Sequence, residues 1–412
     1  MTQQIAKRQR DPRLDFFRGL GMFIILIAHI PWNSWTDWIP ARFGFSDAAD
    51  LFVFCSGMAS AIAFAPVFDH LGWLRGAARI LYRVWQVYWA HIGSFFVVLA
   101  LVCTVDAVLG GGRYAADLRI DPVLDDFRAY VGPIMTLRYV PNYFDILPMY
   151  LAILAMTPIV MALERIGKWA AIAAVLGCWL AAQFNLVSLT ADSVSGRQWF
   201  FNPFGWELVF FSGFAFARGW LPAPPRDARL AIAALALVLL AAPVSCQTEF
   251  SCFALWGRAP VLGDVHIWLG PAIDKTAIGA LRYLHFMATA YLAFLAVGPQ
   301  GRNLHGWLAE RIRRVGQQTL AVFLTGLVAA QALGMVLDRI GRGFVNDAAV
   351  NIAGCAILVA AAAIVTWFKS PPWRSLPKRS PASIAPKQDA MREPLAPPSI
   401  PRPETATGAG PG

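Results

Sequence analysis

Charged residues are scarce in this chain. Asp, Glu, Lys and Arg make up 15% of its 412 residues and hydrophobic residues make up 57%, whereas a typical soluble domain is about 25% charged. Signatures of soluble enzymes are missing as well, because the sequence has no HExxH or CxxC metal motif and Ser56 lacks the GxSxG turn of serine hydrolases. These absences argue against a soluble enzyme, a metal site and a serine nucleophile.

Long apolar segments are abundant instead. A helix needs about 20 mostly apolar residues to cross the roughly 30 Å hydrocarbon core of a membrane. Candidate segments lie near residues 14–31, 51–68, 80–108, 144–163, 168–187, 204–219, 228–246, 277–298, 315–337 and 347–368. We therefore predict an all-α, polytopic integral membrane protein with about ten transmembrane helices.

The basic residues are distributed unevenly between these segments. If the N-terminus is cytoplasmic, most of the 35 Lys and Arg residues fall on the cytoplasmic side, as the positive-inside rule requires in a bacterial inner membrane. We predict that both termini are cytoplasmic and that the first helix is retained, because no small-residue cleavage site follows Ile30. The net charge of +10 thus reflects orientation, and we expect membrane lipids rather than nucleic acid as partners.

Both ends of the chain differ in composition from its centre. Residues 1–12 are polar and residues 370–412 are proline-rich, so we expect disordered segments on either side of one membrane domain at 13–369. Outer loops are expected near 109–143, 188–203 and 247–276. For the first loop, a lid or acceptor platform and a plain solvated loop are both open.

The cysteines fall into two groups. Cys246 and Cys252 share the third outer loop, where an oxidising periplasm would permit a disulfide. The remaining cysteines lie within apolar segments, where a small buried hydrophobic side chain is the expected role.

Ionisable side chains inside apolar helices are costly and therefore mark candidate functional positions. In the predicted topology Arg18 lies about one turn into the first helix, and His29 lies about 16 Å further along it. His29 thus shares an outer layer with ionisable residues of three other helices, namely Asp47, Asp50, Glu207, Arg282 and His285. A second, cationic layer on the inner side contains Arg18, Arg79 and Arg83, with His91 between the two layers.

Structural roles are alternatives for several of these residues. Arg79 and Arg83 also fit positively charged anchors at the membrane interface. Asp50 fits the N-cap of the second helix, and His91 fits a buried structural histidine.

Several motifs follow one another along the apolar part of the chain. LDFFRG at 14–19 is followed by His29, and FSDAADLFVFCSG occupies 45–57. Arg83 with Tyr88 and His91, DILPMY at 145–150, FNPFGWELVFFSG at 201–213, LRYLHF at 281–286 and GQQTLAVF at 316–323 complete the set. In their order and spacing these motifs resemble the OpgC-type succinyltransferases of osmoregulated periplasmic glucans, within a large superfamily of membrane-bound acyltransferases. The resemblance covers residues 11 to about 368.

This resemblance implies transfer of an acyl group, expected to be succinyl, from cytoplasmic succinyl-CoA to hydroxyls of a periplasmic glucan, without a bound cofactor. His29 would act as general base on the sugar hydroxyl, oriented by Asp50 or Glu207. Arg18, Arg79, Arg83 and His91 would bind coenzyme A. The acyl group and the acceptor would meet Asp47, Arg282 and His285, with Arg282 or His285 stabilising the oxyanion.

Other functions fit the same residues. A transporter or flippase for a glycan or lipid would also place buried charges along a path, and a non-catalytic membrane scaffold is a third possibility. Within the enzyme class, acetyl transfer, a different polysaccharide acceptor, a covalent acyl-enzyme and a homodimer are open. Release of free coenzyme A thiol only in the presence of an acceptor would distinguish the enzyme from a transporter.

Overall fold

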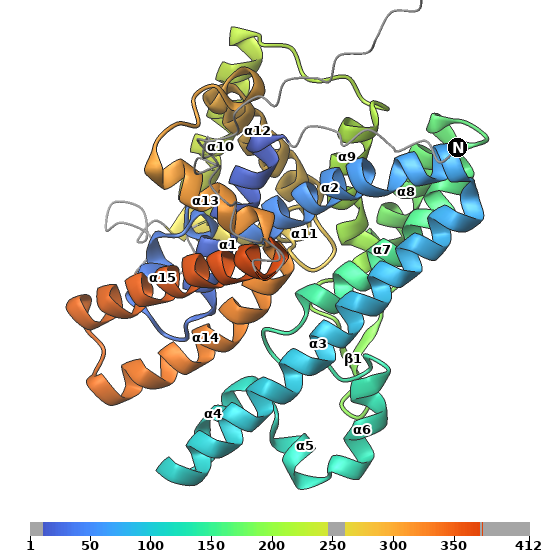
Figure 1. The fold of residues 1–412 in the computed structure, drawn as a ribbon. Coiled ribbons are helices and arrows are strands. Elements are labelled where there is room, and N and C mark those ends of the chain that lie inside the picture. Colours follow the sequence, from blue (N-terminus) through green and yellow to red (C-terminus); the bar gives the residue numbers. More distant parts are fainter. Residues whose placement is uncertain (1–10, 246–259, 371–372, 374–412) are drawn as a thin grey trace, which may run out of the picture. The chain divides into compact units, whose positions relative to one another are not determined.

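The computed structural model describes residues 11–245, 260–370 and Trp373 (Figure 1). Within these residues the chain is almost entirely helical, and the strands form one two-stranded sheet. The predicted all-α class is therefore confirmed. Most of residues 1–12 and 370–412 lie outside the described part, so the predicted division into a membrane domain and two disordered ends stays a prediction.

Each of the predicted spans overlaps a helix. These helices are α1 (Pro12–His29), α2 (Ala48–Leu71), α3 (Trp73–Leu109), α7 (Ile146–Glu164), α8 (Lys168–Gln183), α9 (Pro203–Arg218), α10 (Ala228–Ser245), α12 (Ala280–Val297), α14 (Thr319–Ile340) and α15 (Phe344–Lys369). Of the helices that the structure describes, 7 are long and apolar enough to cross a membrane, judged by length and composition. They are α2, α3, α7, α10, α12, α14 and α15.

The other three predicted spans fall short for identifiable reasons. α8 and α9 have 16 residues each, and α1 carries Arg13, Asp15 and Arg18 in its first two turns. The predicted count of about ten spans therefore stays a prediction. The cytoplasmic location of both termini stays a prediction as well.

Helices distant in sequence pack closely around α1 and α2 (Figure 1). α1 packs against α2, α13 (Trp307–Gln317) and α14, while α2 packs against α9. The α2–α9 crossing is tight, because a Cβ atom on Gly57 would lie 1.8 Å from the carbonyl oxygen of Phe210. Small residues permit such close helix contacts inside membranes. This crossing fixes the position of the N-terminal end of α2, which carries the first site residues.

Two segments predicted as outer loops fold together into a cap, defined here as residues 110–144 and 188–200. The first contains the short helices α4 (Arg113–Leu118), α5 (Asp121–Asp125) and α6 (Phe127–Met135), and the second contains strands β1 (Thr190–Asp192) and β2 (Arg197–Gln198). Tyr139 pairs with Asp192 in an antiparallel bridge, and the Val140 N–H donates to the Ala191 carbonyl oxygen at 2.7 Å. The first loop is therefore folded, and its role as a lid or acceptor platform stays a prediction.

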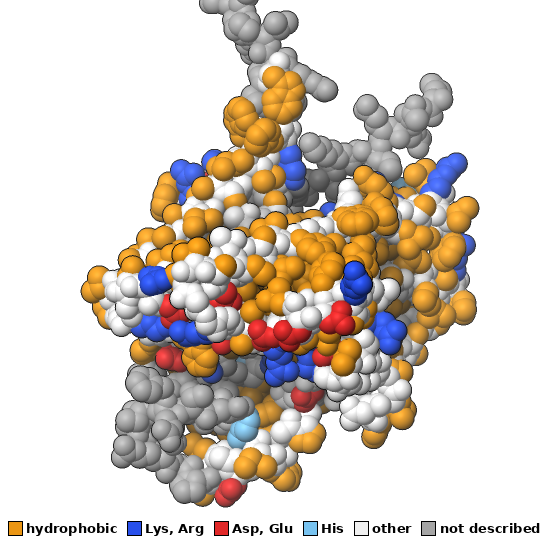
Figure 2. All heavy atoms as spheres, turned by 90° about the horizontal axis from the view of Figure 1, so that it is seen from below, with side chains coloured by type: hydrophobic (Ala, Val, Ile, Leu, Met, Phe, Trp, Pro, Cys, Tyr) orange, Lys and Arg blue, Asp and Glu red, His pale blue; other side chains and the backbone are white. Residues whose placement is uncertain are grey.

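The cap has a hydrophobic core of its own. Phe95 of α3 packs there with Ile120, Val140 and Trp199 of the cap, so this core joins the cap to the long α3. Figure 2 shows the molecule from below the view of Figure 1, with charged side chains of both signs gathered in the middle of this face and hydrophobic side chains beside them.

Two predicted boundaries are wrong. The span predicted at 315–337 begins inside α13, and the chain leaves helical geometry at Gln318 before α14. The loop predicted at 247–276 contains the apolar helix α11 (Pro260–Ile273). The short 3-10 helices η1 (Ser34–Trp38), η2 (Pro40–Arg42) and η3 (Pro299–Gly301) complete the elements.

The cysteines of the described residues, Cys55, Cys103, Cys178 and Cys355, are free thiols. Cys246 and Cys252 lie outside the described residues, so the suggested disulfide stays open.

Candidate functional site

The N-terminal end of α2 is held by two aspartates. Asp47 caps the helix, since its carboxylate accepts the Ala49 N–H at 2.8 Å. Asp50 reaches back and accepts the Asp47 N–H at 2.8 Å. This arrangement is a capping box, which satisfies backbone donors at both ends of the first turn. The cap residue is therefore Asp47, and Asp50 is the third helical residue rather than the N-cap.

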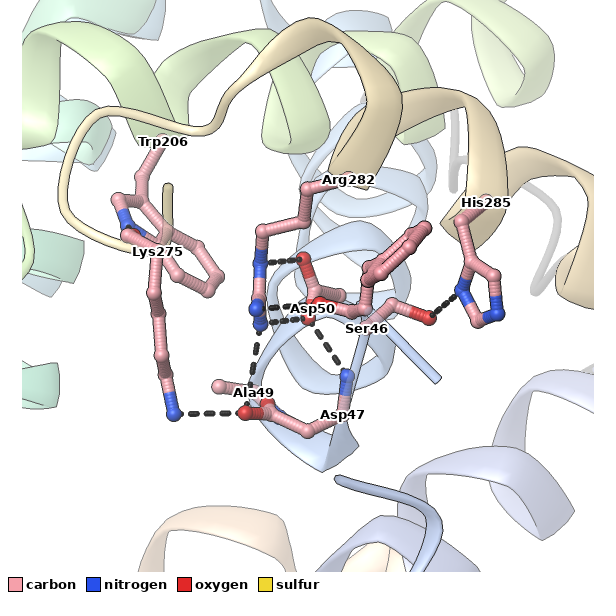
Figure 3. A network of polar contacts seen from close by, with 9 residues as sticks. Ser46, Asp47, Ala49, Asp50, Trp206, Lys275, Arg282 and His285 are labelled. Carbon is pink, nitrogen blue, oxygen red and sulfur yellow. Dashed lines mark hydrogen bonds and ion pairs between the residues drawn. The ribbon is translucent and has the colours of Figure 1, made fainter. Parts of the chain in front are cut away.

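Arg282 of α12 joins these two aspartates (Figure 3). Its Nη2 lies 2.5 Å from Asp50 Oδ2 and 3.3 Å from Asp47 Oδ2, and its Nε donates to Asp50 Oδ1 at 3.2 Å. Its Nη1 donates to the carbonyl oxygen of Phe45 at 2.5 Å. Asp50 is fully buried and Arg282 is 5% exposed, so the paired geometry is what makes these buried charges tolerable.

Lys275 completes the charge balance, although the sequence analysis does not single it out. Its Nζ lies 2.6 Å from Asp47 Oδ2 and 5.4 Å from the centre of the Phe201 ring. Two cations thus face two carboxylates. Burial opposes the ionisation of Asp47, but Lys275 and Arg282 hold the pKa of its carboxyl well below the usual value.

A cavity of about 280 Å³, called the chamber below, lies between this network and the end of α1. Its walls include His29, Asp47, Tyr143, Asp145, Phe200 and Lys275. The His29 Nδ1 lies 2.6 Å from the Ile25 carbonyl oxygen. Because a carbonyl oxygen can only accept, Nδ1 carries the proton in neutral His29 and Nε2 is the nitrogen that can take one.

The orientation of His29 differs from the prediction. The partner of its Nδ1 is a backbone carbonyl of its own helix, and neither Asp50 nor Glu207 is hydrogen-bonded to it. Asp50 is engaged by Arg282 instead. Glu207 is 2% exposed, interacts electrostatically with Cys178 of α8, and its Oε1 has no hydrogen-bond partner among the described residues. The neighbouring Trp206 faces Arg282. Because consecutive side chains on a helix diverge by about 100°, Glu207 points in a different direction from Trp206.

Arg282 and His285 lie behind the chamber wall rather than on it. The guanidinium of Arg282 is occupied by Asp47, Asp50 and the Phe45 carbonyl. The His285 Nδ1 lies 2.8 Å from Ser46 Oγ, and its ring packs against Phe45. Neither residue is among the side chains that line the chamber. Their contact with the acyl group therefore stays a prediction, and Lys275 is the cation that lines the chamber.

The inner cationic layer is only partly assembled. Arg18 and Arg83 interact electrostatically with each other, and Asp15 and Tyr150 also act on Arg18. The Nε of Arg18 is buried and has no hydrogen-bond partner in the described part of the chain. Arg79 is exposed and lies over the Phe64 ring at 5.9 Å. Arg18 and Arg83 are thus the pair that could meet an anionic group together.

His91 belongs with neither layer. It follows Arg83 on α3 by about 12 Å of helix rise, is 3% exposed, and packs against Phe144 with ring centres 6.0 Å apart. This position fits the structural alternative stated for His91.

Asp145, immediately before α7, is a site residue that the sequence analysis quotes only within a motif. It lines the chamber and also an adjacent cavity. Burial raises the pKa of its carboxyl to about 6. A carboxyl group that is costly to ionise, placed between two cavities, is typical of a functional position. As for metals, the described residues contain no cluster of three or more His, Cys, Asp and Glu side chains that could hold an ion.

Comparison with known proteins adds one result. A family model described as OpgC protein matches residues 10–370. No curated protein matches the chain, and no solved structure matches it.

Proposed function

Because this chain belongs to the OpgC protein family, we propose that it transfers a succinyl group from cytoplasmic succinyl-CoA to a hydroxyl of a periplasmic glucan. Membership supports a glucan-modifying acyltransferase in the broad sense and a membrane location. The donor, the acceptor, the inner membrane and the catalytic base are part of the proposal. The observation that carries it is the chamber, where His29 presents Nε2 as a base beside the ammonium group of Lys275.

The proposed chemistry needs one base and one stabilising cation. His29 Nε2 takes the proton of the sugar hydroxyl while that oxygen attacks the thioester carbonyl carbon. The negative charge that develops on the carbonyl oxygen is stabilised by Lys275, whose ammonium has three donors and uses one on Asp47. The carbon–sulfur bond then breaks, and the leaving thiolate recovers the proton from the His29 imidazolium. An ester and free coenzyme A result.

The donor would enter from the opposite end of α1. Arg18 and Arg83 supply two guanidinium groups that can pair with the phosphates of coenzyme A, and the exposed Arg79 can add a third contact. Arg18 lies about 16 Å of helix rise from His29. The slender thiol arm of coenzyme A would cover this distance and bring the thioester into the chamber.

A transporter or flippase is the second candidate, because a cavity beside paired charges also suits a transported solute. The two functions differ in a direct measurement. The enzyme should release coenzyme A thiol from succinyl-CoA only when glucan is present, whereas a transporter should release none under either condition.

The proposal is tested by separating donor binding from transfer. Replacing Arg18 with Gln removes a charge-assisted contact worth about 1.5–3 kcal/mol, so donor affinity should fall roughly ten- to hundredfold. Replacing His29 with Gln should leave donor binding nearly unchanged and lower the transfer rate by roughly 10²–10⁴-fold. Both quantities are measured on purified protein, as acyl-CoA binding and as succinylated glucan by mass spectrometry.

The control for these variants is His70→Gln, because His70 is exposed near the end of α2 and lines neither cavity. A stable His29→Gln protein that binds acyl-CoA and acylates glucan at the rate of His70→Gln would end this mechanism.

A further inference from the structure

A second cavity, called the cleft below, adjoins the chamber. It measures about 530 Å³, within the size range of small-molecule sites. The cap and the segment before α12 line it with Arg119, Asn142, Tyr143, Arg197, Gln198 and Phe200, among others. Tyr143, Asp145 and Phe200 line both the cleft and the chamber. A ligand in the cleft would therefore contact Tyr143, whose ring centre lies 5.3 Å from that of His29.

The side chains of the cleft suit hydroxyl groups. A hydroxyl donates one hydrogen bond and accepts two, and amide side chains such as Asn142 and Gln198 can do both. Phe200 is 47% exposed and offers an apolar face beside these polar groups. Alternating polar edges and apolar faces are what a sugar unit presents.

The cleft carries only a small net charge. Its lining holds two cations, Arg119 and Arg197, and one carboxylate, Asp145. The Arg197 Nη2 donates to the Val140 carbonyl oxygen at 2.5 Å, and its positive charge acts on Asp145 and on Asp192, which lies outside the lining. The cleft therefore offers hydrogen bonds without the cluster of cations that a polyanion would need, which favours a neutral ligand.

Asp145 holds an unused acceptor at the boundary between the two cavities. The backbone N–H of Phe200 favours its charged form, but Oδ1 is buried and has no hydrogen-bond partner within the described residues. Buried polar atoms in proteins are nearly always paired, so an unpaired one calls for an explanation. The neighbouring Tyr143 has a φ of 69°, an uncommon backbone conformation for a residue other than glycine, and such outliers cluster at binding sites.

We propose that the cleft binds the acceptor as a run of neutral, hydroxyl-rich sugar units, and that Asp145 accepts a hydrogen bond from a hydroxyl beside the one that reacts at His29. This inference rests on the proposed function for the identity of the reaction, and it assigns the acceptor site that the proposed function leaves open. It also gives the cap a role, since the cap builds most of the cleft.

The test is a binding measurement on the full-length purified protein without any acyl-CoA. The probe is a short linear glucose oligomer, titrated by calorimetry, and the comparison ligand is a galacturonic acid oligomer of the same length. We expect the glucose oligomer to bind at least about tenfold more tightly. Asp145→Ala should weaken its binding by about tenfold or more, since a hydrogen bond to a charged group is lost, and Asp145→Asn should weaken it less because an acceptor oxygen remains.

The matched control is Asp125→Ala, at the exposed end of α5 in the same cap, which should bind like the wild type. Equal thermal midpoints of the variants would show that the cap is folded. The inference is overturned if the wild type does not bind the glucose oligomer, if the galacturonic acid oligomer binds more tightly, or if Asp145→Ala binds like Asp125→Ala. This binding test contains no acyl donor and does not depend on acyl transfer. If the glucose oligomer binds as expected but the protein transfers no acyl group in the separate activity test, the proposed function fails and the cleft assignment stands.

Discussion

At the scale of single residues, Arg282 and its aspartates depend on one another. Removing one partner of a buried ion pair costs about 3–5 kcal/mol, because the remaining charge is left uncompensated. Asp50→Leu and Arg282→Met should therefore each lower the thermal midpoint and the yield. The double variant removes one charge of each sign and leaves Asp47 paired with Lys275 at 2.6 Å, so it should be more stable than either single variant. Thermal unfolding of the four proteins in detergent measures this coupling, and a double variant less stable than both singles would contradict it.

Residue chemistry also explains what the sequence could predict about the site. Ionisable residues in apolar helices are costly, so Asp47, Asp50 and Arg282 could be grouped in one layer. Their pairing was not predicted, because Arg282 was expected to meet the acyl group or the oxyanion. Lys275 was not predictable, because a lysine in an outer loop is ordinary until the fold places it on Asp47. The partner of His29 was hidden for a different reason: it is a backbone carbonyl, which every residue has.

At the scale of elements, the close crossing of α2 and α9 requires a glycine at position 57. Ala at position 57 would place its Cβ 1.8 Å from the Phe210 carbonyl oxygen, so one helix must move, and overpacking of this kind typically costs about 1–3 kcal/mol. Gly57→Ala should therefore lower the thermal midpoint. The control is Gly93→Ala in α3, where an added Cβ would meet no atom within 4 Å apart from the backbone of its own helix, and the higher helix propensity of Ala should be neutral or slightly stabilising. Equal midpoints for the two variants would rule out the tight crossing.

Elements were predictable where they are long and apolar. All predicted spans overlap helices. About 20 apolar residues in succession are typical of a membrane-spanning helix, so such segments can be recognised from the sequence. The cap helices α4, α5 and α6 have 6, 5 and 9 residues, too few to show a helical period. The boundary between α13 and α14 was missed because the chain turns at Gln318 without a proline or glycine at that position.

At the scale of the whole molecule, the orientation in the membrane is still a prediction. With both termini in the cytoplasm, α11 should face the periplasm. A cysteine replacing Asp264 in α11, in a protein without its native cysteines, should react with a membrane-impermeant maleimide from the periplasmic side. A cysteine replacing Thr2 should be protected under the same conditions and serves as the control. Labelling of position 264 from the cytoplasmic side only would reverse the topology, and with it the sides assigned to donor and acceptor.

The ion pair between α2 and α12 also has a consequence for how the protein is made. Asp50 and Arg282 are separated by 232 positions in the chain, which a ribosome working at about 5–20 residues per second translates in roughly 10–50 s. For that interval α2 is already synthesised while the cation that neutralises its carboxylates does not yet exist. The chamber can close only after α12 has been inserted. A nascent chain interrupted before Lys275 would carry two aspartates without either of their cations at the end of an apolar helix, and these unpaired charges would distinguish unfinished copies from complete ones.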